Sequence, residues 1–314
     1  MPEQDSDILV VGSLNMDVIA FTPRFPAPGE TLMGSRWTTA NGGKGANQAV
    51  AAARLGGRVA MLGCVGRDAY GATLREALLR DGIDCDGILT DPETPTGVAL
   101  ITVSEQDSQN SIIVISGSNM RLTPDHIDAS SRLIARANIV VCQLEVPLAT
   151  VARVIETAAA MSKLVILNPA PPAAPGALSG SLLSKVGILI PNESEAAALC
   201  GLPVTSVPQA EAAAKALRSR GCRDVIVTLG HRGVVHAGPD GARHFPAHAA
   251  KPVDTTAAGD TFIGGLSAAL SRGESLEAAI EFGQSAAAVA VSRVGAQASI
   301  PTLAELGGHF TAEQ

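Results

Sequence analysis

The chain has 314 residues, of which 46% are hydrophobic and 17% are charged, and its net charge is −7. This composition excludes a disordered chain, because it supplies enough apolar surface for a large core. The acidic balance and the lack of a Lys/Arg cluster argue against a nucleic-acid binder. No signal-peptide pattern opens the sequence, and no apolar run approaches the ~20 residues of a membrane span. Five scattered cysteines without a CxxC pair predict reduced thiols. We therefore expect a cytoplasmic protein.

Short apolar runs rich in Val, Ile and Leu alternate with helical patterns along the chain. Such runs are typical of strands buried on both faces of a sheet. They lie at 7–12, 58–66, 138–145, 163–171, 187–193 and 224–230. Helical patterns lie between them, at 45–57, 72–83, 147–161 and 208–221. This alternation predicts one α/β domain over residues 1–314, with a doubly wound, mostly parallel sheet flanked by helices.

Two stretches break this rhythm, at residues 18–40 and 96–116. Both are extended and partly alternating, and the second has the pattern of a hairpin that turns near residues 107–110. We expect them to form a small antiparallel sheet that stands off the main sheet as a lid. An exposed strand edge needs a pairing partner, so these lid strands also predict a homodimer.

Polar residues stand where several of the predicted strands end. They are Asn15 and Asp17 after the first strand, and Glu145, Asn168, Asn192 and Thr228 after later ones. Because the carboxyl ends of parallel strands meet at one edge of an open sheet, and ligands bind beyond that edge, we expect a binding site there.

The stretch NGGKGANQA, residues 41–49, places glycines at the start of a helix, where backbone amides favour anions or sugar oxygens. It is not a P-loop, because no Ser or Thr follows Lys44. It is not a dinucleotide fingerprint either, because Gln48 replaces the third glycine. Two interpretations of Asn47, one turn inside, stay open: a polar residue on the helix face, or a ligand contact.

The stretch DTTAAGDTFIGG, residues 254–265, also opens a helical pattern. Its small residues Ala257, Ala258 and Gly259 would bring backbone amides to a helix start, where phosphate oxygens bind. Asp260 stands at the same end. It either stabilises the helix dipole or accepts a proton from an alcohol that attacks the phosphate, which is what phosphoryl transfer to a hydroxyl requires.

These motifs occur in the order GSLNMD, GGKGANQAVAAARLG, NPAP, PNESEA, TLGHRG and DTTAAGDTFIGG. In that order, over residues 7–302, the chain resembles the ribokinase (PfkB) family of sugar kinases. The resemblance implies a doubly wound α/β domain with a β-lid. It also implies phosphorylation of the 5-hydroxyl of D-ribose by ATP, giving D-ribose 5-phosphate and ADP, with Mg²⁺ and an activating K⁺.

The resemblance also implies roles for individual residues. Asp260 is the general base, beside an anion hole of Ala257, Ala258 and Gly259. The sugar is held by Asn15, Asp17, Gly43, Lys44, Asn47, Glu145 and Asp260. The nucleotide is held by Asn192, Thr228, Gly230, Gly233, Gly259 and Gln284. Glu195 holds Mg²⁺ through water. The monovalent cation is held by Asp254, Thr256, Ala290, Arg293, Gly295 and Ser299. Two positions depart from the family pattern: Gln284 replaces a usual histidine, and Ser299 lacks a preceding proline.

Three other functions remain to be weighed. A related kinase could act on fructose, deoxyribose or a nucleoside. A sugar-binding protein without catalysis could share the fold, but Asp260 and the glycine of the anion hole argue against it. A nicotinamide dehydrogenase is disfavoured because the sequence has no GxGxxG.

Overall fold

The computed structural model describes residues 7–107, 109–174 and 176–311, so the predicted domain over 1–314 extends outside the described residues. Within these ranges, nine strands form a sheet in the order β13-β12-β11-β10-β9-β8-β1-β4-β5. Their bounds are β1 Ile8–Val11, β4 Val59–Gly66, β5 Asp84–Asp91, β8 Ile139–Cys142, β9 Leu164–Leu167, β10 Ile188–Leu189, β11 Asp224–Thr228, β12 Val234–Gly238 and β13 Gly241–Phe245.

The order of these strands confirms a doubly wound sheet. From β1 the chain adds β4 and β5 on one side, then returns to add β8, β9, β10 and β11 on the other. All these strands run parallel, whereas β12 and β13 pair antiparallel at one edge. The direction of winding changes between β1 and β8, which opens a crevice at their carboxyl ends. The sequence predicted the six other strands but not β5, β12 and β13.

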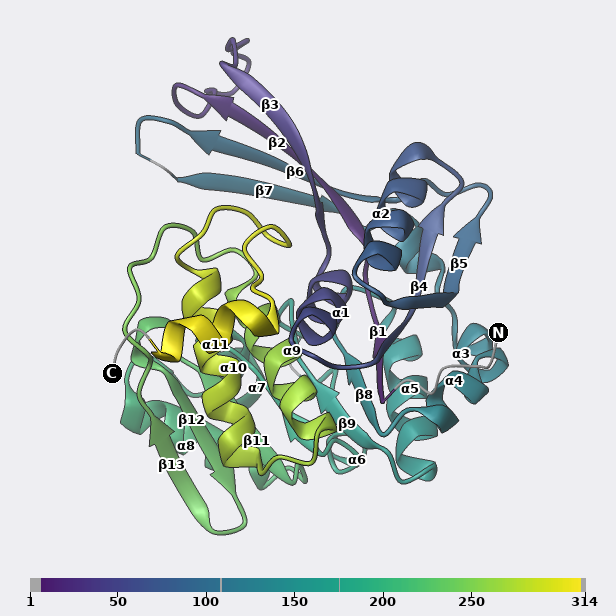
Figure 1. Ribbon diagram of the computed structural model, residues 1–314, viewed down its shortest axis with the longest axis vertical. Coiled ribbons are helices and arrows are strands. Elements are labelled where there is room, and N and C mark those ends of the chain that lie inside the picture. The colour runs from purple at the N-terminus through teal and green to yellow at the C-terminus, as the bar shows by residue number, and fades with distance from the viewer. Residues whose placement is uncertain (1–6, 108, 175, 312–314) are drawn as a thin grey trace.

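Helices cover both faces of the large sheet (Figure 1). Their bounds are α1 Lys44–Arg54, α2 Ala69–Arg80, α3 Pro124–Ala129, α4 Ser131–Arg136, α5 Leu148–Ala160, α6 Gly180–Leu183, α7 Glu193–Cys200, α8 Val207–Arg218, α9 Ala258–Ser271, α10 Leu276–Ala290 and α11 Leu303–Thr311, with 3₁₀ turns η1 Gly117–Arg121 and η2 Gly230–Arg232. No helix in the described ranges is long and apolar enough to span a membrane.

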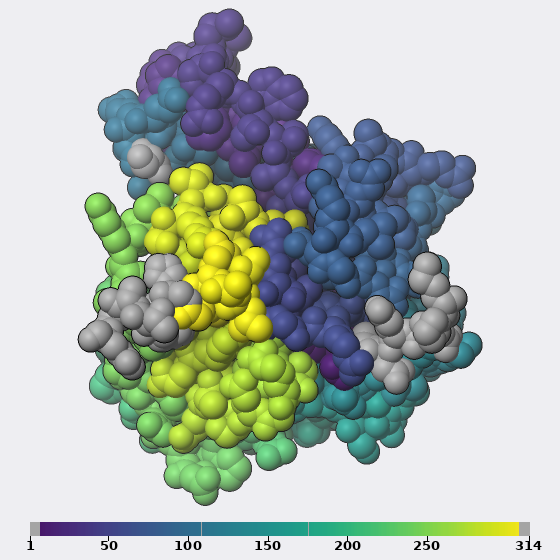
Figure 2. Space-filling view, in the orientation of Figure 1, coloured from purple at the N-terminus to yellow at the C-terminus, as the bar shows by residue number. Residues whose placement is uncertain are grey.

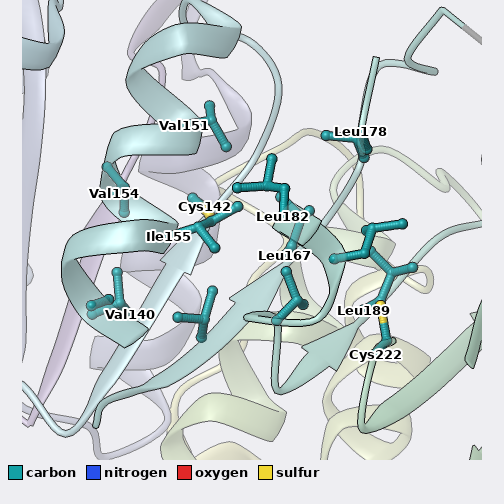
Figure 3. Close-up of a cluster of buried hydrophobic side chains, with 14 of the residues drawn as sticks. Val140, Cys142, Val151, Val154, Ile155, Leu167, Leu178, Leu182, Leu189 and Cys222 are labelled. Carbon is teal, nitrogen blue, oxygen red and sulfur yellow. The ribbon is translucent and has the colours of Figure 1, made fainter. Parts of the chain in front are cut away.

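The core is divided between the two faces of the sheet. Leu9 and Val11 of β1 belong to one buried cluster with α5 and α8, whereas Ile8 and Val10 belong to another with α1 and α9. This follows from the alternation of side chains along a strand. Figure 3 shows part of the first cluster, where apolar residues of α5 lie over β8 and β9. β1, β4, β8 and β9 are buried on both faces and apolar along almost their whole length, as their sequences predicted.

A second sheet projects from the main body (Figures 1 and 2). Its strands are β2 Asn15–Thr22, β3 Arg36–Gly42, β6 Gly97–Ser104 and β7 Asn110–Ile115, in the order β3-β2-β6-β7. A small second sheet is therefore confirmed. It is not purely antiparallel as predicted, because the central strands β2 and β6 run parallel. Residues 23–35, predicted to be extended, lie outside its strands.

Asn15 and Asp17 follow the first strand, as predicted, but they already belong to the second sheet. They lie in β2, where Asn15 pairs with Gly42 on one side and Gly97 on the other. The chain leaves β1 at Val11 and enters the second sheet three residues later, so this sheet starts directly above the crevice of the large one.

Candidate active site

Two cavities meet at the N-terminus of α9. One of about 610 Å³ is lined by apolar residues together with Thr228, His231, His248 and Gln284. The other, of about 500 Å³, is lined by polar residues that include Lys44, Asn192, Glu195 and Asp260. They share Thr228, Gly230, Thr255, Ala258 and Gly259. A molecule with an apolar ring at one end and charged groups at the other fits this pair of cavities.

The N-terminus of α9 has the backbone expected for anion binding. Ala257 precedes the helix with φ +60°, a left-handed conformation that is strained for a residue with a Cβ. Ala257, Ala258 and Gly259 line the polar cavity at this turn. Helix-start amides lack partners within the helix, and of these the amide of Ala258 donates to the carbonyl of Thr255 over 3.2 Å. A Cβ at Gly259 would meet no atom within 4 Å, so open space lies in front of this residue.

Asp260 lies where α1 and α9 touch, and its side chain is held from α1. Asn47 donates from Nδ2 to Asp260 Oδ2 over 3.1 Å, and Gln48 donates from Nε2 to Oδ1 over 2.9 Å. The helices approach closely because Gly264 faces Ala52, where a Cβ would lie 2.7 Å from a backbone nitrogen. The small residues of both helices therefore bring two amides to the carboxylate.

Glu145 follows β8 and reaches the glycine-rich start of α1. Its Oε2 accepts from the backbone amide of Lys44 over 3.1 Å and from the hydroxyl of Ser13 over 2.5 Å. The loops after β1 and β8, on either side of the switch point, are thereby joined to α1. Asp260 raises the pKa of Lys44, and Glu145 and Glu195 add to this against the effect of burial. Lys44 therefore stays cationic in the polar cavity.

Asp17 is a partly buried carboxylate at the start of the second sheet. It packs against Gly42, where a Cβ would lie 2.5 Å from Oδ1. Burial, and then the neighbouring charge of Glu145, raise its pKa from 3.8 to about 7. A carboxyl group that burial makes costly to ionise is typical of a functional site.

Asn192 and Glu195 form a capping box at the start of α7. Glu195 Oε2 accepts from the backbone amide of Asn192 over 2.9 Å, and Asn192 Oδ1 accepts from the amide of Glu195. Burial raises the pKa of Glu195, against the opposing effects of Asn192 and Lys44. Both residues line the polar cavity. No group of three or more His, Cys, Asp or Glu side chains gathers at a metal-binding distance in the described residues.

The loop before α9 is tied to the segment after α10. Asp254 Oδ1 accepts from the amide and hydroxyl of Thr256, and Oδ2 accepts from the amide of Gly295 over 2.9 Å. Burial raises the pKa of Asp254, but these hydrogen bonds outweigh it and the pKa lies below its ordinary value. The amide of Arg293 donates to the carbonyl of Ala290. The hydroxyl of Ser299 donates to Ala296 rather than toward Asp254.

The structure thus brings most residues of the predicted site to one place. Asp260, Ala257, Ala258, Gly259, Lys44, Asn192, Glu195, Thr228, Gly230, Gly233 and Gln284 line the two cavities. Asn47 and Glu145 are hydrogen-bonded to that lining, and Asn15 lies against Gly43. Asp254, Thr256 and Gly295 form a separate cluster between the loop before α9 and the segment after α10. Within the described residues, Ser299 is not hydrogen-bonded to this cluster.

Sequence reasoning missed a group of polar residues around the site. Ser13, Gln48, Asn119 and Gln143 are buried, and His248 is half-buried in the lining of the larger cavity. Most contact partners far away in the sequence, so no local motif marks them. Three buried side-chain atoms have no hydrogen-bond partner among the described residues: Asn47 Oδ1 beside Asp260, Gln284 Nε2 at the larger cavity, and Gln143 Oε1 in the core. A buried polar atom is normally paired, so the two atoms beside Asp260 and the larger cavity point to a ligand.

Comparisons with known proteins agree with this geometry. A family described as pfkB family carbohydrate kinase matches residues 5–303. The chain is 43% identical over 298 residues to a ribokinase of Haemophilus influenzae, covering 95% of this chain and 96% of the relative. It is 37% identical over 305 residues to a deoxyribokinase of Salmonella typhi, covering 97% and 99%.

A solved structure of similar fold is that of Arabidopsis thaliana ribokinase complexed with ribose and ATP. Its TM-score is 0.90 at 32% identity, over 97% of this chain and 98% of that one. The family match and these relatives each cover nearly the whole chain. The chain therefore belongs to the pfkB family of carbohydrate kinases.

Proposed function

We propose that the protein is a ribokinase, which transfers the γ-phosphoryl group of ATP to the 5-hydroxyl of D-ribose. The observation that carries this proposal is the position of Asp260. Its carboxylate lies in the polar cavity at the start of α9, beside helix amides suited to phosphate and next to a second cavity suited to a nucleotide base. The identity to ribokinases over the full chain supports the choice of ribose.

The residues act on the two substrates as follows. Asp260 accepts the proton of the attacking hydroxyl, whose oxygen bonds to the γ-phosphorus. The bond from that phosphorus to the β–γ bridging oxygen breaks, and ADP leaves with its electron pair. The amides of Ala257, Gly259 and Asp260 bind the phosphoryl oxygens, whereas the amide of Ala258 already donates to the carbonyl of Thr255 over 3.2 Å. The cationic Lys44 adds charge on the same side. Asn15, Asp17, Gly43, Asn47 and Glu145 hold the sugar hydroxyls.

The larger cavity holds the nucleotide. Val234, Phe262 and Val291 supply apolar wall for a base, and Gly233 lines the same cavity. Gln284 cannot stack as a histidine does, but its unpaired Nε2 can donate a hydrogen bond to the nucleotide. Thr228, Gly230 and Asn192 lie between this cavity and Asp260, on the path of the phosphates.

Two cations fit the residues present. Glu195 and Glu193 give the polar cavity hard oxygen atoms, which suit a Mg²⁺ that keeps its waters and neutralises the charge of the transferring phosphoryl group. The second site is the loop of Asp254, whose low pKa keeps the carboxylate ionised. With carbonyls near Ala290 and Arg293, and with Thr256, Gly295 and Ser299, it supplies oxygen ligands for K⁺. This loop leads directly into the helix start.

We also propose that the protein is a homodimer in the cytoplasm. The edge strand β7 exposes Ile112, Ile113, Val114 and Ile115, with exposed fractions of 49–62%. A second copy that covers this strand would remove an unpaired apolar edge. We propose that the lid sheets of two copies meet there and close over the sugars. Sedimentation velocity at micromolar concentration tests this, since a monomer would contradict it.

The experiment that tests the function is a coupled assay of ADP release with a panel of sugars. D-ribose should give the highest kcat/KM, above 2-deoxyribose, fructose and nucleosides. The deoxyribokinase relative makes 2-deoxyribose the main second candidate. If 2-deoxyribose were turned over with the higher kcat/KM, the ribose assignment would be wrong while the kinase assignment stood. If no sugar released ADP above background, both would be wrong.

A further inference from the structure

Gln48 has no role in the site as described so far, yet it contacts the carboxylate of Asp260. Its side chain is 1% exposed, and its Nε2 lies 2.9 Å from Asp260 Oδ1 and 3.2 Å from Asn168 Oδ1. We propose that Gln48 is a positioning residue for the carboxylate of Asp260, and that Gln143 fixes the orientation of the Gln48 amide. The proposal rests on the proposed function, because it assigns Asp260 as the base.

The two oxygens of Asp260 are held by different donors. Asn47 donates to Oδ2 and Gln48 donates to Oδ1, and the two donors are consecutive residues of α1. Turning the carboxylate about its Cβ–Cγ bond would break both hydrogen bonds. The plane of the Asp260 carboxylate is therefore set by the side chains of two consecutive residues of α1. A base held in this way presents its remaining lone pairs in one direction, which is what orientation contributes to catalysis.

The carboxylate of Asp260 determines which way the side-chain amides around Gln48 are oriented. An ionised carboxylate only accepts hydrogen bonds, so Gln48 must present its NH₂ to it. Its Oε1 then faces Gln143, which donates from Nε2 over 2.5 Å. Asn168 is fixed in the same sense, because its Nδ2 donates over 2.9 Å to the carbonyl of Ile190 and its oxygen faces Gln48. If the side-chain amide at any of these positions were reversed, two oxygens or two NH₂ groups would face each other.

Gln143 has no room to turn. It is fully buried after β8, and a Cβ placed on Gly12 of the loop after β1 would overlap with its Oε1. That oxygen has no hydrogen-bond partner among the described residues. Gln143 is therefore fixed by packing at the switch point of the sheet, and its Nε2 donates to Gln48 Oε1. In this way the core of the sheet sets the orientation of the base.

The first test is Gln48→Met, which keeps the volume of the side chain and removes the donor. A hydrogen bond to a charged acceptor supports a fall in kcat of about 10- to 100-fold. The KM values for sugar and ATP should change by less than about 3-fold, because the contact orients the base and touches neither substrate. An unchanged kcat, or a rise in the sugar KM that accounts for the whole loss in kcat/KM, would overturn the proposal.

The second test compares Gln143→Met with Gln143→Glu. Methionine removes the donor to Gln48, whereas glutamate at this fully buried position is neutral and can still donate its O–H to Gln48 Oε1. If orientation matters, kcat should be at least about 10-fold lower for the methionine variant than for the glutamate variant, since only glutamate keeps a donor at Gln48 Oε1. Equal kcat values in the two variants would show that Gln143 acts only by packing. Thermal unfolding of each variant confirms that the compared proteins are folded.

A crystal structure of Gln48→Met separates this inference from the proposed function. The orientation of the Asp260 carboxylate can be compared with that of the wild type without any substrate. A rotated or disordered carboxylate supports the positioning role whichever sugar is the substrate. An Asp260 carboxylate that superposes on the wild type overturns it, even if ribose proves to be the substrate.

Discussion

The side-chain amide of Asn119 donates a hydrogen bond over 2.8 Å to Oδ1 of Asn15. Asn119 itself is fixed by the backbone of Leu14, whose amide donates to its Oδ1 over 2.9 Å and whose carbonyl accepts from its Nδ2 over 3.1 Å. Because the oxygen of Asn15 is already used, its NH₂ group remains for a ligand. Asn119 thus fixes which side of the Asn15 amide can donate to a ligand.

We predict that Asn119→Asp raises the KM for ribose by about 10-fold, because the carboxylate opposes Asn15 Oδ1 and turns its amide away from the sugar. The hydrogen bond from the amide of Leu14 is kept in this variant. Steady-state kinetics measures the effect, and Asn138→Asp, a change at an exposed residue directly before β8, is the control. A KM equal to that of the wild type would contradict the orientation of Asn15.

Gly42→Ala tests the contact between Gly42 and Asp17. The new Cβ would lie 2.5 Å from Asp17 Oδ1 and 2.7 Å from Cγ, so the carboxylate must move. The free energy of unfolding should fall by only about 1 kcal/mol, because the displaced group is the end of a side chain. The KM for ribose should rise by about 10-fold or more. Gly180→Ala, whose Cβ would meet nothing closer than 3.6 Å, should leave the KM unchanged.

Asp17→Asn should make stability less dependent on pH. The pKa of Asp17 is raised to about 7 in the folded protein, so the folded state binds more protons than the unfolded state above pH 4. The free energy of unfolding therefore falls as the pH rises from 4 through 7. At pH 8 the variant should be more stable than the wild type by about 1–3 kcal/mol, after allowance for partial exposure, and equally stable near pH 4. Urea unfolding at both pH values measures this difference.

The control for this change is sugar binding, which Asp17→Asn should weaken most above pH 7, where the wild type carries a carboxylate acceptor. A stability difference of the same size at pH 4 and pH 8 would show that burial does not raise the pKa of Asp17.

Potassium should increase kcat relative to sodium at equal ionic strength, because the Asp254 loop leads into the anion hole and would be steadied by a large cation. Asp254→Ala should abolish the difference between the two salts and lower kcat in potassium toward its value in sodium. The assay compares the two proteins in KCl and NaCl. Equal wild-type rates in both salts would exclude an activating role for this loop.

The parts of the site that sequence predicted are those with local signals. Asp260 is the third residue of α9, as its position after three small residues indicated, and Glu145, Asn168 and Asn192 follow strands of the large sheet. The parts that it missed depend on long-range pairing. Gln143 and Gln48 are 95 residues apart, and Asn119 and Asn15 are 104 apart. No periodicity records which distant amides face one another once the sheet has formed.

The dependence on distant residues also explains which parts of the fold were predicted wrongly from the sequence. A strand buried on both faces is recognised by its apolar run, so the strands from β8 to β11 were predicted. The edge strand β13 alternates between exposed and half-buried residues until Phe245, and lacks such a run. Asn15 begins a strand only because Gly42 and Gly97 pair with it, and this pairing cannot be deduced from residues near Asn15.

The most direct measurement is ADP release with ribose by the wild type and by Asp260→Ala, with ribose affinity measured by calorimetry for both. The wild type should release ADP only when ribose is present. The variant should bind ribose within about 10-fold of the wild-type affinity and lose a factor of about 10³ or more in kcat, because no other group at the site replaces the base. Near-normal turnover by Asp260→Ala would contradict the assignment of Asp260 as the base.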